Sequence, residues 1–223
     1  MGKRFVPEAI FFDVDGVLID SMHVKGEAFA DVFGAYPDHR VAIMAFHMEH
    51  GGVTRRDKID RIAREVLGFC LAPEELDDLV TEFGKVVVDR VVAAPEIPGA
   101  TLALTYWSQL TRLYAVSATP VEELRAILRD RGIADYLQVI EGAPIGKSQA
   151  INSIATDQGY QRRNCVLVGD SRQDADSASE SSVLFVQVCP SGGQLFPEAD
   201  AVVPDLRTLD VAIHALTGSL LDP

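Results

Sequence analysis

One stretch decides how the chain is interpreted: Ala9-Ile10-Phe11-Phe12-Asp13-Val14-Asp15-Gly16-Val17-Leu18. Its apolar, aromatic-rich first part is typical of a strand, and that part ends at two carboxylates and a glycine. Because alternate residues of a strand point to the same side, Asp13 and Asp15 are expected to face one spot at its carboxyl end. Their charges repel, and a divalent cation would remove that cost. A simple Asp-Gly turn fits this local pattern at least as well.

The composition excludes several classes of protein. The chain has 223 residues, of which 48% are hydrophobic and 24% charged, as in ordinary globular proteins. A net charge of −13 argues against a general surface for nucleic acid or anionic membranes. The three cysteines form no CxxC pair and are expected to be reduced. No signal peptide or membrane-length apolar run is recognised, so we expect a cytoplasmic protein, a monomer or homodimer.

The segment from Ser21 to about Ala93 has helical periodicity and almost no strand signal. Pro73 begins a fourth helix of this segment. Three apolar stripes at helical spacing precede it: Ala28, Phe29, Val32 and Phe33; Val41, Met44, Ala45 and Met48; Ile59, Ile62, Ala63 and Val66. We therefore expect a helical cap over residues 20–93, inserted into a catalytic core of residues 1–19 and 94–223.

Beyond the Pro-Gly-rich segment 94–99, strand and helix patterns alternate. Thr119-Pro120-Val121-Glu122 is read as a capping box, with Thr119 as the N-cap residue of a helix. The expected strands are Ala9–Phe12, Arg112–Val116, Gln138–Glu141, Cys165–Val168, Val183–Val188 and Ala201–Val203. This alternation predicts an α/β fold, a Rossmann-like parallel sheet covered on both faces, with the site at the carboxyl ends of its strands.

Functional-looking side chains follow the predicted strands in order. Ser117, Lys147, Asp170 and Asp174 join the two carboxylates of the opening stretch. Singly, Ser117 and Lys147 fit ordinary strand-end and helix-start positions, and Asp170 and Asp174 fit a helix cap and first turn. Together they suit Mg²⁺, which prefers oxygen ligands, and a phosphate group. A phosphate-loop motif needs four residues between its glycines, and only three separate Gly142 from Gly146.

These residues carry a resemblance to a known family. Asp13-Val14-Asp15-Gly16-Val17-Leu18, Ser117, Lys147 and Gly169-Asp170-Ser171-Arg172-Gln173-Asp174 resemble the four ordered motifs of the haloacid dehalogenase superfamily. The helical insert lies where that family has its small cap. Within the family, the chain is most similar to the branch of phosphoglycolate phosphatases and β-phosphoglucomutases.

The resemblance implies a role for each motif residue. Asp13 would be the nucleophile that forms an aspartyl-phosphate, and Asp15 would exchange protons with the leaving group and the attacking water. The metal ligands would be Asp13, the backbone carbonyl of Asp15, and Asp170, with Asp174 supporting them. Ser117, the N–H of Ala118, and Lys147 would bind the phosphoryl group. The second aspartate of the motif indicates phosphate-ester chemistry.

The chain departs from the family pattern at two places. Many relatives have a histidine where this chain has Lys25, and many have a Lys-Pro pair where Lys147 precedes Ser148. In the cap, Gly51-Gly52 precedes a cluster of basic residues at the place of a substrate-selecting loop. Thr54 or Arg55, nearest the turn, is expected to point into the cleft and to hold substrate hydroxyls or an anionic group; a solvated helix face explains the cluster as a whole. His47 and His50 are not interpreted as a metal site.

The leading hypothesis is a Mg²⁺-dependent phosphatase acting on a small phosphorylated metabolite, such as a sugar, polyol or glycolate-type phosphate monoester. A phosphomutase would use the same residues but return the phosphoryl group to its substrate. A receiver-type signalling domain also combines acids, Ser/Thr and Lys, but it is about half this length and has no helical insert. A non-catalytic binding protein is the remaining alternative, although no motif residue is missing.

Overall fold

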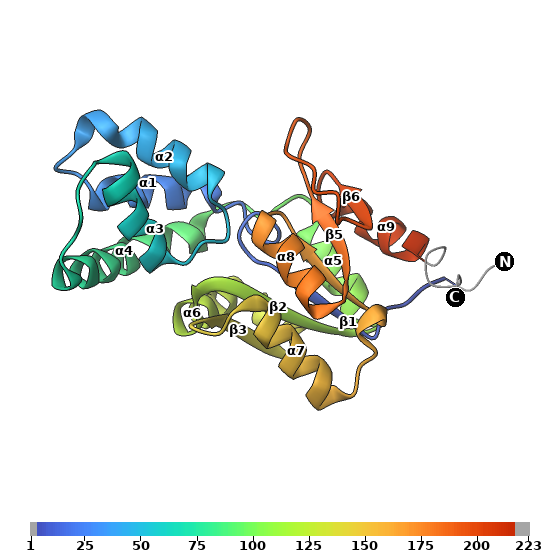
Figure 1. The fold of residues 1–223 in the computed structure, drawn as a ribbon. Helices are drawn as coiled ribbons and strands as arrows, with labels where there is room; N and C mark the ends of the chain where they lie inside the picture. The colour runs from blue at the N-terminus through green and yellow to red at the C-terminus, as the bar shows by residue number, and fades with distance from the viewer. Residues whose placement is uncertain (1–3, 217–223) are drawn as a thin grey trace.

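The core of the protein is a six-stranded parallel sheet in the order β3-β2-β1-β4-β5-β6 (Figure 1). The computed structural model describes residues 4–216. The sheet confirms the expected Rossmann-like α/β core. Its strands are β1 (Ala9–Phe12), β2 (Arg112–Pro120), β3 (Val139–Ala143), β4 (Cys165–Gly169), β5 (Leu184–Val188) and β6 (Ala201–Val203).

The central strands are hydrophobic on both faces because helices cover both faces. Every residue of β1 and β4 is buried. Alternate residues of β1 belong to two separate apolar clusters: Ile10 and Phe12 to one, Ala9 and Phe11 to the other. The parallel register pairs Phe12 with Ala115 of β2 and with Val168 of β4, so these three strands reach the same edge together.

Five helices of the core pack on the sheet. Residues of α7 and α8 belong to the same apolar cluster as Phe11. Residues of α5, α6 and α9 belong to the cluster of Ile10, on the opposite face. Their bounds are α5 (Ala100–Ser108), α6 (Val121–Asp130), α7 (Lys147–Gln158), α8 (Arg172–Ser181) and α9 (Leu209–Ala215). Short 3-10 turns lie at Pro37–His39, Ala134–Tyr136, Arg162–Asn164 and Leu206–Thr208.

Four further helices form a unit beside the carboxyl edge of the sheet, which we call the helical layer (Figure 1). They are α1 (Met22–Val32), α2 (Arg40–Glu49), α3 (Arg55–Arg61) and α4 (Pro73–Ala93), and a π-helical turn, Ile62–Val66, follows α3. Phe29 and Phe83 pack at 4.2 Å between ring centroids and join α1 to α4. The Arg131 side chain, just beyond α6, donates to the Val92 carbonyl at 2.7 Å and so binds the carboxyl end of α4 to the core.

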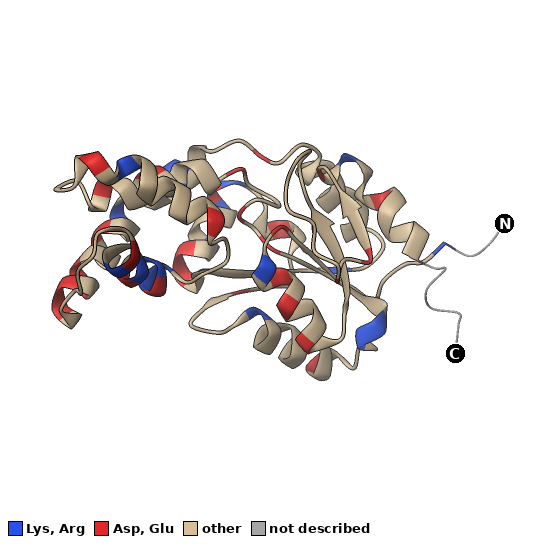
Figure 2. Ribbon diagram, turned by 45° about the horizontal axis from the view of Figure 1, so that its top comes forward, with Lys and Arg blue, Asp and Glu red and all other residues tan. Residues whose placement is uncertain are grey.

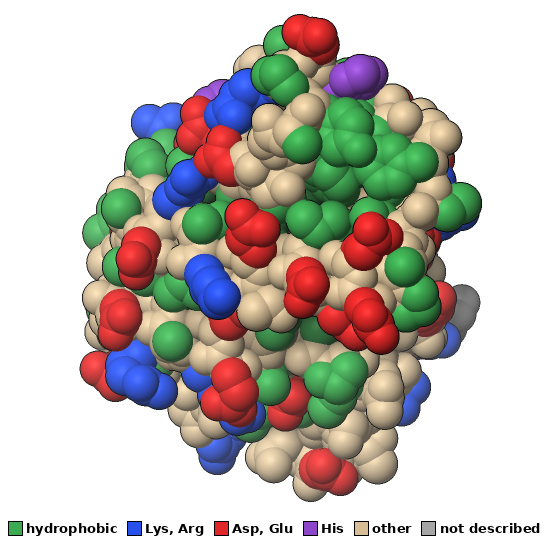
Figure 3. Space-filling view, turned by 90° about the vertical axis from the view of Figure 1, so that its left-hand side faces the viewer, with side chains coloured by type: hydrophobic (Ala, Val, Ile, Leu, Met, Phe, Trp, Pro, Cys, Tyr) green, Lys and Arg blue, Asp and Glu red, His purple; other side chains and the backbone are tan. Residues whose placement is uncertain are grey.

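The buried stripe of α2 differs from the expected one. Val41 and Met48, predicted to pack inward, are 80% and 54% exposed. Ile43, Phe46 and His47 are buried instead. Figure 3 views the molecule from the side of the helical layer and shows hydrophobic side chains gathered near the top, where α2 lies. The prediction was wrong because a polar residue, His47, takes an inward position that a hydrophobicity pattern assigns to its neighbours.

The cluster of basic residues that follows the Gly51-Gly52 turn is mostly neutralised locally. Arg61 and Arg64 pair with Glu65 and Asp60 across one helical turn, at 2.7 Å in each case. Arg56 pairs with Asp77 of α4. Figure 2 shows the same alternation of basic and acidic residues on the helices of the layer. Among residues 4–216, no helix is both long and apolar enough to cross a membrane.

We predict that Ile10→Ala lowers the free energy of unfolding by about 2–5 kcal/mol, because the side chain is fully buried in the central strand and its removal leaves a cavity. Urea unfolding monitored by circular dichroism measures the change. Leu102→Ala is the control, because Leu102 is 72% exposed on α5 and its loss should change the value by less than about 0.5 kcal/mol. Equal effects of the two substitutions would contradict the assignment of the core.

Candidate active site

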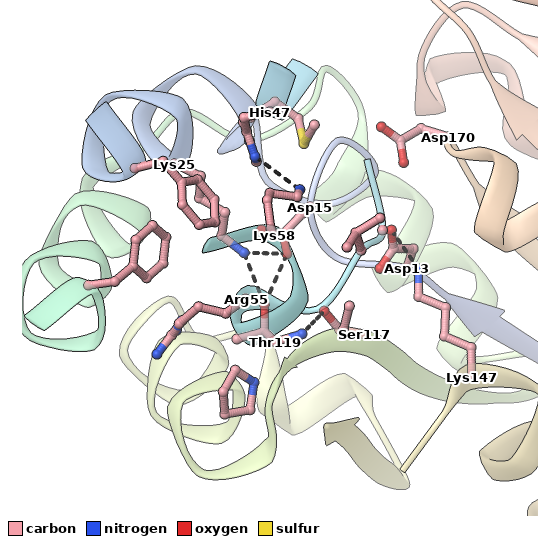
Figure 4. Close-up of a pocket in the computed structure, with 17 residues that line it drawn as sticks. Asp13, Asp15, Lys25, His47, Arg55, Lys58, Ser117, Thr119, Lys147 and Asp170 are labelled. Carbon is pink, nitrogen blue, oxygen red and sulfur yellow. Dashed lines mark hydrogen bonds and ion pairs between the residues drawn. The ribbon is translucent and has the colours of Figure 1, made fainter. Parts of the chain in front are cut away.

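The carboxyl edge of the sheet collects functional side chains from several strand ends. The backbone N–H of Asp13 donates to the Val168 carbonyl of β4 at 2.9 Å, which fixes the end of β1 beside the end of β4. A cavity of about 60 Å³ lies between this edge and the helical layer (Figure 4). Its wall includes seven of the expected site residues: Asp13, Asp15, Arg55, Ser117, Ala118, Lys147 and Asp170.

Lys147 holds two buried carboxylates at the floor of this cavity. Its Nζ lies 3.0 Å from Asp13 Oδ2 and 2.6 Å from Asp174 Oδ1, and all three side chains are almost fully buried. Burial disfavours the charged lysine, but the two carboxylates outweigh it and raise the Lys147 pKa. Asp174 also accepts from the backbone N–H and hydroxyl of Ser171, at 3.1 and 2.6 Å. Asp174 therefore supports the floor from behind Lys147 and does not line the cavity.

Three carboxylates crowd together at this point. Oxygen atoms of Asp13, Asp170 and Asp174 lie within 4.8 Å of one another. Burial raises the pKa of Asp13 to about 7, and the neighbouring acids add to the shift while Lys147 opposes it. Burial, and after it the charge of Asp13, also raises the pKa of Asp170 well above its ordinary value. One lysine therefore does not compensate three carboxylates when all of them are ionised.

The cluster fits a hard divalent cation. All of its donors are carboxylate oxygens, the ligands that Mg²⁺ prefers. The Asp170 carboxylate packs so closely against Gly16 that a Cβ on this glycine would lie 2.1 Å from Oδ2. Gly16 also has a φ of +81°, a left-handed conformation that glycine adopts without strain. The backbone after Asp15 is thus shaped to let Asp170 approach Asp13.

Asp15 is held in its ionised form by groups of both the core and the helical layer. It accepts from the Ser21 hydroxyl at 2.5 Å. It also accepts from the Lys25 ammonium at 2.5 Å and from Thr119 Oγ1 at 3.1 Å (Figure 4). Burial alone would raise the pKa of Asp15, but the Lys25 charge and these hydrogen bonds lower it to about 2. The carboxylate is therefore ionised in this arrangement.

Thr119 has a different role from the one that its sequence position predicts. The expected capping box is wrong: α6 begins at Val121, and Pro120 occupies the N-cap position without a side-chain hydrogen bond. The Thr119 hydroxyl instead bonds Lys25 and Asp15, while its backbone N–H donates to Ser117 Oγ at 3.1 Å. Sequence reasoning missed Thr119 as a site residue because Thr followed by Pro and Glu matches a helix start.

The two cap residues singled out from the sequence have different positions. Thr54 is the N-cap of α3 and exchanges hydrogen bonds with Asp57, so its hydroxyl is used within the helix and does not line the cavity. Arg55 does line the cavity, but its guanidinium makes a two-pronged ion pair with Glu123 of α6. It also lies 4.7 Å from the centre of the Phe83 ring. Arg55 therefore binds the helical layer to the core.

Gly52 lies where the helical layer makes close contact with the core. It has a φ of +78°, and a Cβ there would lie 2.6 Å from Gln173 Oε1 and 3.0 Å from Ser171 Oγ. Both contacts belong to the start of α8, the helix that carries Asp174. The turn after α2 thus touches the motif helix through its backbone.

A family model described as haloacid dehalogenase-like hydrolase matches residues 7–181. This match spans most of the chain and all four motifs, and the chain belongs to this family of hydrolases.

A curated relative is the phosphoglycolate phosphatase of Synechococcus elongatus, which is 26% identical over 188 residues, 81% of this chain and 83% of the relative. Among solved structures, a predicted phosphoglycolate phosphatase from Haemophilus somnus superposes with a TM-score of 0.75 at 17% identity, covering 94% of this chain and 98% of the other. CbbY from Rhodobacter sphaeroides, solved with phosphate, gives a TM-score of 0.72 at 19% identity, covering 91% and 96%. The expectations of a haloacid dehalogenase fold and a phosphatase enzyme are confirmed.

We predict that Glu123→Gln destabilises the protein by about 1–3 kcal/mol, because it leaves the Arg55 guanidinium buried without a counterion. Thermal unfolding measures the loss, and amide hydrogen exchange should rise in α3 more than in β1. The matched control is Glu122→Gln, one residue away, where the side chain is 83% exposed and the change should be below about 0.5 kcal/mol. Identical stability of the two variants would show that the ion pair does not hold the helical layer to the core.

Proposed function

We propose that the protein is a Mg²⁺-dependent phosphatase that hydrolyses a small phosphate monoester through an aspartyl-phosphate. The observation that supports this most directly is the pair Asp13 and Asp15. One carboxylate is held by Lys147 and the other by Lys25, and both line one cavity. Such a pair can divide nucleophilic attack from proton transfer, which phosphate-ester hydrolysis requires.

Hydrolysis proceeds in two displacements. In the first, an Asp13 carboxylate oxygen bonds to phosphorus and the bond from phosphorus to the ester oxygen breaks. Asp15, which takes up a proton from water once an anionic phosphate beside it raises its pKa, gives that proton to the leaving oxygen. In the second, the Asp15 carboxylate takes a proton from water, whose oxygen displaces Asp13 and releases inorganic phosphate. The low pKa of Asp15, about 2 beside Lys25, suits the second displacement, in which the ionised form is needed.

Positive charge and hydrogen-bond donors stabilise the transferring group. The Lys147 ammonium, the Ser117 hydroxyl and the backbone N–H of Ala118 are proposed to bind the phosphoryl oxygens. Asp13, Asp170 and the backbone carbonyl of Asp15 would hold Mg²⁺, with Asp174 fixing Lys147 behind them. The ion neutralises charge on the phosphoryl oxygens when it is bound.

The dimensions of the site favour a small substrate. The cavity of about 60 Å³ lies between the sheet edge and the helical layer, with Gly52 and Arg55 on its wall, and it is small for a bulky substrate. A sugar, polyol or glycolate-type phosphate fits this description. The Synechococcus relative, whose name specifies phosphoglycolate, makes that ester the first substrate to test.

We predict that Asp13→Asn abolishes phosphate release while the protein stays folded, because the amide cannot attack phosphorus. The test is a phosphate-release screen over several dozen monophosphates with Mg²⁺, followed by circular dichroism of the variant. Asp176→Asn, an exposed position on α8, is the control and should keep full turnover. Substantial hydrolysis by Asp13→Asn would rule out the nucleophile. A phosphomutase would instead convert its substrate without releasing phosphate.

We also predict that EDTA removes the activity and that excess Mg²⁺ restores it, because the crowded carboxylates need a cation before an anionic phosphate can approach. The measurement is the initial rate before chelation, after chelation and after Mg²⁺ is added back. Undiminished turnover of protein dialysed against EDTA would contradict the metal requirement.

A further inference from the structure

Four basic side chains line the cavity, and they differ in their partners. Lys25 pairs with Asp15, Arg55 with Glu123, and Lys147 with two carboxylates. Within residues 4–216, Lys58 makes no ion pair with a carboxylate, although its side chain is among the buried ones. Of these four residues, Lys58 is thus the one whose charge could pair with a bound ligand.

The hydrogen-bond partner of Lys58 is a histidine. Lys58 Nζ lies 3.1 Å from His47 Nδ1, and both residues are buried, with exposures of 3% and 2% (Figure 4). Burial and the Lys58 charge lower the pKa of His47 to about 3, so the ring is neutral and accepts through Nδ1. The histidine orients the lysine but does not neutralise it.

A buried ammonium without a counterion is unfavourable to folding. Burial, followed by the charge of Lys25, lowers the pKa of Lys58 to about 7. The negative charges of Asp15 and Asp170 act on it across the cavity in the opposite direction, and Arg61 adds to the lowering. An arrangement that costs stability in the free protein is expected where a ligand supplies the missing charge.

We propose that Lys58, oriented by His47, binds a second anionic group of the substrate, a carboxylate or a second phosphate close to the phosphoryl group. This inference rests on the proposed phosphatase function and narrows it to doubly anionic small phosphate esters. Arg55, the residue expected from the sequence to hold such a group, is already paired with Glu123. Lys58 lies one helical turn further along α3, on the wall of the same cavity.

Ligand binding to a protein that cannot turn over tests the inference. In the Asp13→Asn background, calorimetry compares phosphoglycolate and ethylene glycol bisphosphate with hydroxyethyl phosphate, whose other end is an uncharged hydroxyl, each in the presence of Mg²⁺. Adding Lys58→Met should weaken binding of an ester with a second anionic group by about 10-fold to 100-fold relative to hydroxyethyl phosphate, the range of a charge-assisted hydrogen bond. A greater loss of affinity for phosphoglycolate identifies the second group as a carboxylate, and a greater loss for the bisphosphate identifies it as a phosphate. Arg56→Met, on the exposed side of α3, is the matched control and should leave the ratio unchanged.

Thermal stability separates a ligand-binding lysine from a structural one. Between pH 7 and 10.5 the unfolded chain holds the Lys58 proton that the folded chain has lost, so the cost of burial is largest at pH 7 and below. Lys58→Met should therefore melt at the same or a higher temperature than the parent at pH 6. If methionine at this position disturbs the packing, the melting temperature of Lys58→Gln, which keeps a polar side chain, is compared with that of the parent in the same way.

Two outcomes overturn the inference. They are an unchanged ratio of affinities in both Lys58 variants, and a lower melting temperature of both variants at pH 6. The proposed function fails separately, if the wild-type protein with Mg²⁺ releases phosphate from no ester in the screen.

Discussion

The structure depends on the balance of charge around Lys147. Three carboxylates converge at the edge of the sheet because β1 and β4 end there together. Parallel strands bring their carboxyl ends to one edge, so the fold itself creates the repulsion. Lys147 offsets part of it by bonding Asp13 and Asp174 at once, and α7 begins at the lysine so that the side chain can reach both. The remaining repulsion is what supports the proposal of a metal ion at this site.

The helical layer completes the chemistry of the core in addition to covering it. Lys25 belongs to α1, yet its ammonium donates to Asp15, which follows β1, and to Thr119, which lies in β2. The proton affinity of Asp15 is therefore set by a residue of the layer. Lys58 and His47, from α3 and α2, lie on the wall of the same cavity. The proposed chemistry and the proposed choice of substrate would thus both depend on how the layer sits over the sheet.

The sequence predicted the parts of the fold that follow from local patterns. β1 and β4 were recognised because a strand buried on both faces is a continuous apolar run. Asp13 and Asp15 line one cavity as expected, although β1 ends at Phe12, before both of them. The residues at four strand ends could be grouped because the order of strands and helices implied a parallel sheet. What each of these residues does chemically is still proposed.

The contacts that were missed are all long-range. Thr119 lies 104 residues from Asp15, its acceptor, and Glu123 lies 68 residues from Arg55. No local pattern distinguishes a threonine that caps a helix from one that bonds a distant carboxylate. In α2 the inward position of His47 became understandable only with Lys58 beside it. Polar residues inside the cavity wall break the hydrophobic periodicity on which the prediction relied.

Gly52 illustrates how little space separates the two parts of the molecule. Its backbone rests directly on the side chains of Ser171 and Gln173, so no side chain of the turn itself stands between the helical layer and the core at this point. A larger residue there would push the turn after α2 away from the start of α8. The absence of a side chain at this position thus sets how closely the helical layer can approach the core.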